Sequence, residues 1–144
     1  KIFPSIQIET KIKKETKKNM DIDPDFLDNI KYSSADSYLV LSVCYKGSIN
    51  FNPRMKGNLP EQDHIISKSI LKKSGISDDK INSIYNIRLI GSTENKTKSS
   101  NNIILNDKNE FKKHMIPDGD WDVNNYDTFI SCRKKLLKSA FSYK

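Results

Sequence analysis

Two short stretches, Asp63-His64-Ile65-Ile66 and Asn86-Ile87-Arg88-Leu89-Ile90, decide how this chain is expected to fold. Each has the length and the apolar, β-branched content of a buried strand, so we predict strands over Asp63–Ser67 and Asn86–Ile90. Gly91–Thr93 then indicates a turn, and a helix capped by its serine or threonine can start near Glu94. Strand, strand and helix in this order would bring the helix back across a two-stranded ribbon.

Helices are expected around this unit. Tyr38–Tyr45 is apolar almost throughout, and periodicity alone does not separate a buried helix from a buried strand there. Helix is favoured because Ser34 or Asp36 can cap its start and Gly47 follows its end. Shorter helices are expected after Pro24, after Ser67, after Ser77 and over Asn106–Met115. A long C-terminal helix is indicated by the apolar stripe Tyr126, Phe129, Ile130, Leu136, Leu137, Ala140 and Phe141, with Arg133, Lys134, Lys135 and Lys138 on its opposite face.

The composition indicates one domain with a strongly basic surface. The chain has 144 residues, 35% hydrophobic and 30% charged, and a formal net charge of +7. Its 25 basic residues include only three arginines, Arg54, Arg88 and Arg133. A lysine excess favours a polyanionic partner, because cations near phosphates release condensed counterions. A basic surface without a partner, or a composition inherited from an AT-rich genome, would give the same balance.

Cysteine usage and hydropathy bear on the compartment. Cys44 and Cys132 are far apart and form no CxxC pair, which argues against a structural zinc site and a disulfide framework. We therefore expect a cytoplasmic protein. No apolar run approaches the length of a membrane span, and no signal peptide is visible, so no membrane partner is expected. Because the chain begins with Lys1, we expect residues 1–35 to be an extension or linker from a preceding domain and residues 36–144 to be the domain that carries the motif.

The polar residues of the predicted ββα unit are those needed to hydrolyse a phosphodiester. Such a reaction requires an activated water, neutralised charge on the phosphate and help for the leaving oxygen. His64 is the natural base near neutral pH. Its neighbour Asp63 can bind a metal ion, and Asn95, in the first turn of the predicted helix, can add an amide carbonyl. Mg²⁺ prefers few protein oxygens and several waters, so these two ligands suffice.

The order Asp63-His64, then Asn86, then Asn95-Lys96 resembles the ββα-metal (His-Me finger) core of HNH endonucleases. It resembles the nicking domain of RNA-guided CRISPR effector nucleases, and more closely the C-terminal HNH domain of restriction proteins that carry a ParB-like N-terminal domain. These include modification-dependent (type IV) enzymes of the GmrSD kind. Ile81-Asn82-Ser83-Ile84-Tyr85-Asn86, Ile116-Pro117 and the segment from Tyr126 to Arg133 match further parts of that pattern. The likeness runs from about Tyr38 to the C-terminus.

The resemblance implies an α+β, mostly helical fold with a small ββα-metal core and surrounding helices. It also implies that Asp63 and Asn95 bind Mg²⁺, with Mn²⁺ or another divalent ion able to substitute, and that His64 is the general base. Asn86 would orient His64 and tie the strand to the helix. Two positions depart from the pattern. Ser67 stands where the family often has proline, and Asn95 stands where many members have histidine, which favours magnesium over zinc.

The implied activity is a one-metal DNA endonuclease in a bacterial anti-phage restriction system, with a preceding ParB-like domain as partner. DNA phosphates would be contacted by the cations near the core, which position DNA without reading bases. These are Lys68, Lys72, Lys73, Lys96, Lys98 and Arg88. The alternative is a non-catalytic basic module that docks on DNA or on a protein.

Three other features have simpler interpretations. His114, beside Lys113, is expected to be an exposed helix residue. The run Asp118-Gly119-Asp120-Trp121-Asp122 lacks the length and the downstream glutamate of a calcium-binding hand, so an acidic turn is favoured. Trp121 is expected to cover the core, not to stack on a base.

Overall fold

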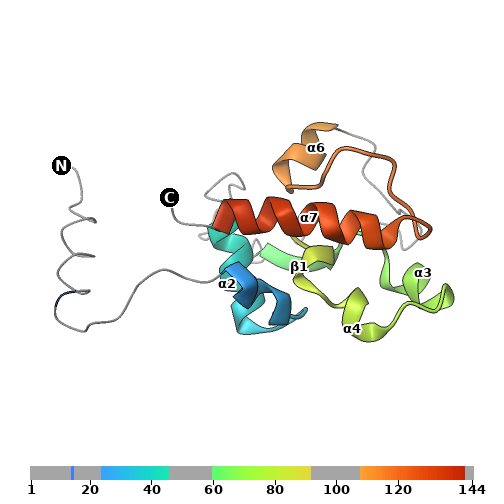
Figure 1. Ribbon diagram of the computed structural model, residues 1–144, viewed down its shortest axis with the longest axis horizontal. Helices are drawn as coiled ribbons and strands as arrows, with labels where there is room; N and C mark the ends of the chain where they lie inside the picture. Colours follow the sequence, from blue (N-terminus) through green and yellow to red (C-terminus); the bar gives the residue numbers. More distant parts are fainter. Residues whose placement is uncertain (1–13, 15–23, 46–59, 92–107, 142–144) are drawn as a thin grey trace.

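The computed structural model describes residues 14, 24–45, 60–91 and 108–141, and these form an α+β fold with a small two-stranded sheet (Figure 1). Its elements are the 3₁₀ helix η1 (Pro24–Asn29), α2 (Ala35–Tyr45), β1 (Pro60–His64), α3 (Lys68–Lys73), α4 (Asp78–Ile81), η2 (Ile84–Asn86), β2 (Ile87–Gly91), α6 (Lys108–Lys113) and α7 (Tyr126–Phe141). The mostly helical α+β class is therefore confirmed. The helix expected near Glu94 lies outside the described residues.

The sheet is an antiparallel pair of β1 and β2, in which Pro60 lies opposite Gly91 and His64 lies opposite Ile87. The second strand, Ile87–Gly91, lies one residue from the predicted Asn86–Ile90. The first strand is shifted by three residues toward the N-terminus: it spans Pro60–His64 instead of the predicted Asp63–Ser67. Beyond His64 the chain bends, and the next N–H groups donate to the main-chain and side-chain oxygens of Asn86. Pro60 is tolerated as the first strand residue, where its missing N–H costs least.

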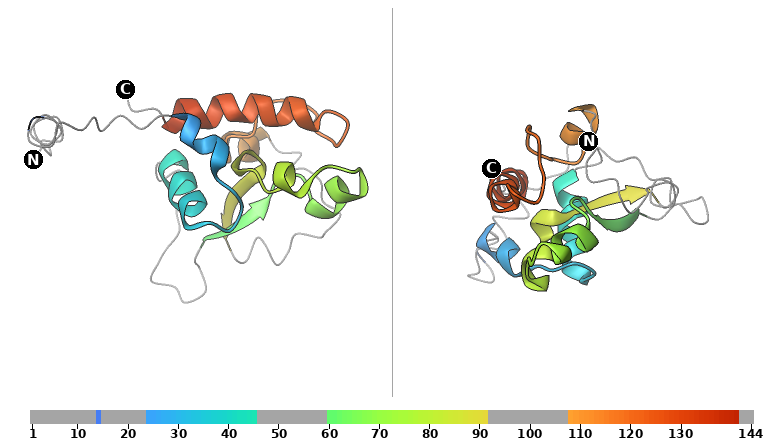
Figure 2. Two further views of the ribbon diagram at one scale, coloured as in Figure 1. Left: turned by 60° about the horizontal axis from the view of Figure 1, so that its bottom comes forward. Right: turned by 90° about the vertical axis from the view of Figure 1, so that its right-hand side faces the viewer.

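Helix α7 runs along one side of the described part of the molecule, with η1 and α2 next to it (Figure 2). One apolar core fills the space between α2, α7 and β2 and includes the fully buried Leu41, Leu89 and Leu137. A second core joins the start of α7 to the segment after β1, with Ile66 and Phe129 fully buried. The two cores link α7 to β2 and to the segment after β1.

The N-terminal part of the described chain belongs to this packing. Leu27 of η1 and Ile30 are buried in the same core as Leu137 of α7. The main chain of Lys31 forms an isolated antiparallel bridge with Ser83. Residues 24–35, the described part of the expected extension apart from residue 14, therefore pack against the elements that follow. The expected domain boundary between residues 35 and 36 falls at the start of α2.

The expected position of Arg133 is wrong. Arg133, expected on the basic outer face of α7, is fully buried, and its guanidinium donates to the carbonyls of Tyr85 and His114. The spacing from Tyr126 through Phe129 to Leu137 places position 133 inside the apolar stripe, whereas Leu136 is 40% exposed. The helical period, not the charge, determined which face Arg133 occupies.

His114 is also buried, with only 1% of its surface exposed. Its Nδ1 lies 3.4 Å from the Tyr45 hydroxyl. Burial, together with the positive charges of Arg88, Lys113 and Arg133, lowers the pKa of His114 to about 3.

Among the described residues, no helix is both long and apolar enough to cross a membrane.

Candidate functional site

His64 ends β1, and two residues from outside the sheet contact its imidazole. The ring of Tyr32, between η1 and α2, lies 4.5 Å from the imidazole centroid to centroid, with 37° between the two planes. The Oδ1 atom of Asn82, which follows α4, lies 3.1 Å from His64 Nε2. Neither residue is among those predicted for the site. Asn82 belongs to the stretch Ile81–Asn86 that carries the family likeness, whereas no sequence signal pointed to Tyr32.

Asn86 is fully buried at the junction of η2 and β2. The Ile66 N–H donates to its Oδ1, and its Nδ2 donates to the carbonyls of Ile66 and Ile81. A buried amide with three such bonds fixes the main chain on both sides. The sequence predicts that Asn86 orients His64. The described bonds reach the main chain two residues beyond His64, so they hold the backbone from which the imidazole projects.

Asp63 and Arg88 lie opposite each other in the sheet and form an ion pair, with Arg88 Nε 2.9 Å from Asp63 Oδ2. Both side chains are largely buried, 13% exposed for Asp63 and 7% for Arg88. The expected contact between Arg88 and a DNA phosphate does not fit this position, because the guanidinium points into the protein and binds a carboxylate. The charge of Arg88 suggested a position on the surface, but its ion pair with the largely buried Asp63 holds the side chain inside the protein.

Asp63 and His64 have different described neighbours, as expected for successive strand residues that point to opposite faces. Arg88 binds Asp63, whereas Tyr32 and Asn82 contact His64. The carboxylate of Asp63 is the donor type that Mg²⁺ prefers. Asn95, the other predicted ligand, lies outside the described residues, as do Lys96 and Lys98.

Three of the lysines expected to contact phosphate lie on α3, which begins soon after β1. Lys72 and Lys73 are exposed, and Lys68 is half-buried. Lys72 Nζ lies 3.1 Å from Asp78, so an acid already partly balances its charge. The positions of Lys68 and Lys73 therefore fit a phosphate contact best.

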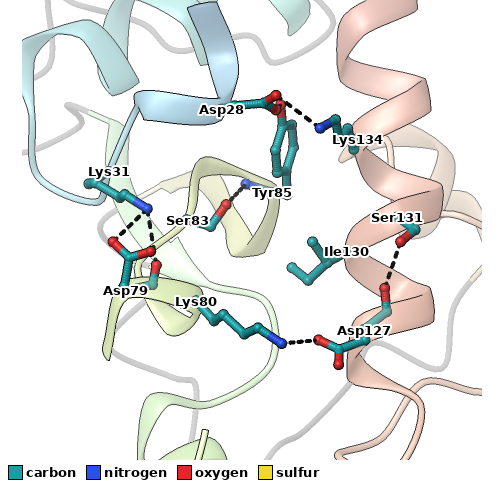
Figure 3. Close-up of a pocket in the computed structure, with 10 residues that line it drawn as sticks. All are labelled: Asp28, Lys31, Asp79, Lys80, Ser83, Tyr85, Asp127, Ile130, Ser131 and Lys134. Atoms are coloured by element: carbon teal, nitrogen blue, oxygen red, sulfur yellow. Dashed lines mark hydrogen bonds and ion pairs between the residues drawn. The ribbon is translucent and has the colours of Figure 1, made fainter. Parts of the chain in front are cut away.

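A pocket of about 430 Å³ opens between η1, α4 and α7 (Figure 3). Its charged groups are paired, because Lys31 binds Asp79 at 2.8 Å, Lys80 binds Asp127 at 2.9 Å and Lys134 binds Asp28 at 2.9 Å. Burial disfavours the ionised form of Asp28, but hydrogen bonds from Tyr85, Lys134 and Lys138 outweigh it and lower the pKa to about 2. Lining charges that cancel in pairs do not indicate a polyanion site.

Within the part of the chain that the structure describes, no three His, Cys, Asp or Glu side chains gather to hold a metal ion. The predicted site, with one carboxylate from Asp63 and one amide from Asn95, contains fewer than three such side chains, so this finding does not test it. No known protein family, curated protein or solved structure matches this chain.

Proposed function

We propose that this protein is a metal-dependent DNA endonuclease of the HNH type, in which His64 is the general base. The observation that carries the proposal is the bonding of Asn86. This residue belongs to the predicted motif, and its buried amide joins Ile66, two residues after His64 ends β1, to the start of β2. A fully buried amide with three hydrogen bonds to the main chain has a structural role, which is the role that the motif gives to this asparagine.

In the proposed reaction, His64 accepts a proton from a water molecule. The water oxygen forms a bond to phosphorus as the bond from phosphorus to the leaving oxygen breaks, and the leaving oxygen takes a proton from solvent water. Asp63 and Asn95 would hold Mg²⁺, which supplies positive charge at the phosphate when bound. Arg88 holds one oxygen of Asp63 and so restricts the direction of the carboxylate.

The proposed substrate is DNA, contacted along its backbone by Lys68 and Lys73 of α3. The net charge of +7 supports a polyanion but selects no base sequence. On the strength of the motif likeness, we place the activity in a bacterial anti-phage restriction system, with a ParB-like domain as the partner that selects the target.

A plasmid-nicking assay tests the proposal. Supercoiled plasmid is incubated with the protein with and without Mg²⁺, and wild type is compared with His64→Ala and with the control Asn29→Ala, a change at an exposed position in η1. Wild type and the control should nick only with the metal, and His64→Ala should lose about 100-fold or more of the rate. Thermal unfolding checks that all three proteins are folded. Equal nicking by His64→Ala and wild type overturns the assignment.

One observation favours the alternative of a non-catalytic basic module. Arg88 already binds the Asp63 carboxylate, as in a purely structural ion pair. If this alternative holds, gel-shift assays will show binding of DNA or of a partner protein, while plasmid remains supercoiled at every metal concentration.

A further inference from the structure

Tyr32, Asn82 and His64 form a closed set of three contacts. The Tyr32 ring packs against the imidazole, and Asn82 Oδ1 lies 3.1 Å from His64 Nε2. The third contact joins the two outer residues, since the Tyr32 N–H donates to the main-chain carbonyl of Asn82 at 2.7 Å. A ring held on one face and at one nitrogen has little freedom to rotate.

The set is anchored to the body of the protein from both sides. Lys31 and Ser83, the neighbours of Tyr32 and Asn82, form an antiparallel bridge, and the Ile84 N–H donates to the Ile30 carbonyl at 3.1 Å. On the pocket side of this bridge, the ammonium of Lys31 binds both the carboxylate and the main-chain carbonyl of Asp79 (Figure 3). The segment that carries Tyr32 is thus fixed to the turn that carries Asn82.

The hydrogen bond at Nε2 also determines where the imidazole carries its proton. An amide oxygen can only accept, so pairing with Asn82 Oδ1 requires a proton on Nε2 of His64. In a neutral ring the lone pair is then on Nδ1. That tautomer presents Nδ1, and not Nε2, as the atom that takes a proton from water.

We propose that Tyr32 and Asn82 are positioning residues for the general base, and that they hold the His64 imidazole in one orientation with Nδ1 as the basic atom. The inference rests on the proposed function for its catalytic consequence, but the arrangement itself can be measured without activity. Tyr32 lies in the part of the chain that the HNH likeness does not cover. The segment before α2 would therefore be part of the site and not a linker.

Imidazole ¹⁵N NMR tests the arrangement directly. The chain has two histidines, so His114→Gln assigns the signals of His64. At a pH where the ring is neutral, wild type should show a protonated Nε2 and an unprotonated Nδ1. Asn82→Leu, which removes the acceptor at similar volume, should give the mixture of tautomers seen in a free imidazole. A mixture already in wild type, or no change in Asn82→Leu, overturns the inference.

Single-turnover cleavage tests the consequence. Tyr32→Ala and Asn82→Leu should lower the rate about 10- to 100-fold with little change in the protein concentration that gives half the maximal rate, because a displaced base affects the chemical step and not substrate binding. Tyr32→Phe keeps the ring and should retain the rate. Tyr38→Ala is the matched control, since Tyr38 is 38% exposed and Tyr32 is 39% exposed. Wild-type rates in both Tyr32→Ala and Asn82→Leu overturn the inference.

The two proposals fail in distinguishable ways. If His64→Ala cleaves DNA as well as wild type, the proposed function is wrong, and the tautomer measurement alone decides whether Asn82 holds the ring. If His64→Ala is inactive while the Tyr32 and Asn82 variants cleave normally, the nuclease assignment stands and the positioning role is wrong.

Discussion

The side chain of Asn86 pairs with the main chain of Ile66 in both directions, as a neighbouring strand would. The Ile66 N–H donates to Oδ1 at 3.0 Å, and Nδ2 donates to the Ile66 carbonyl at 3.2 Å. The Ile65 N–H donates to the main-chain carbonyl of Asn86 at 2.8 Å. Asn86 thereby extends the pairing of β1 and β2 past His64, where the regular ladder ends, and this fixes the backbone on the C-terminal side of the candidate base.

Replacing Asn86 by leucine should therefore destabilise the fold strongly. The substitution keeps the side-chain volume but leaves the N–H and carbonyl of Ile66 and the carbonyl of Ile81 without this partner in a buried site. We expect a loss of about 2–4 kcal/mol in the free energy of unfolding, measured with denaturant. Asn29→Leu, at an exposed position, should change it by about 0.5 kcal/mol or less. A loss under about 1 kcal/mol for Asn86→Leu would show that the junction is held by other groups.

The ion pair between Asp63 and Arg88 should be measurable as a coupling energy. Removing either partner leaves a largely buried charge, so Asp63→Ala and Arg88→Ala should each destabilise the protein by about 2–4 kcal/mol. The double variant should lose less than the sum of the two single losses, by about 1.5–3 kcal/mol, in a double-mutant cycle. Strictly additive losses would mean that the pair contributes nothing as a pair.

The sequence predicted the elements whose pattern is local. The apolar run Asn86–Ile90 marked β2 to within one residue, and the spacing from Tyr126 to Leu137 marked α7. Both ends of β1 were misplaced: the apolar pair Ile65-Ile66 suggested a strand where the chain bends, whereas the observed strand Pro60–His64 is made of polar residues and a proline. That bend depends on the amide of Asn86, a partner twenty residues further along the sequence from Ile66.

The candidate site was predictable where one residue follows another in a motif, and not where the fold brings distant residues together. Asp63 and His64 were found as neighbours, but the contact of His64 with Tyr32 depends on a bridge between Lys31 and Ser83. Arg88 was assigned to DNA because its charge is visible in the sequence. Its burial is not visible there, since it depends on Asp63 lying opposite it in the sheet register.

Stability should fall in mild acid because of His114. Its pKa in the folded protein is about 3, lowered by burial and by nearby positive charges, against an ordinary value near 6.5 in the unfolded chain. The stabilisation is complete above pH 6.5 and is lost as the pH falls toward 3, because the unfolded chain takes up the proton first. We expect a loss of about 2 kcal/mol between about pH 7.5 and pH 5.

Urea unfolding at several pH values measures this loss, and His114→Gln provides the comparison. The variant keeps a polar side chain at the position but cannot take up the proton, so its stability should be flatter over the same interval by about 2 kcal/mol. The two proteins share every other titrating group, so those contributions cancel in the difference. Parallel pH profiles would show that folding does not shift the pKa of His114.

Salt dependence distinguishes a DNA-binding face on α3 from a merely basic surface. If Lys73 contacts a phosphate, Lys73→Gln should make the negative slope of log K, the DNA association constant, against log salt concentration shallower by about one. It should also weaken binding to all sequences alike. Lys135→Gln is the matched control, because Lys135 is an exposed lysine on α7 and its loss changes the net charge equally. A long-range effect of net charge alone would reduce both slopes by the same amount. The phosphate contact requires the Lys73 slope to change and the Lys135 slope to remain close to that of wild type.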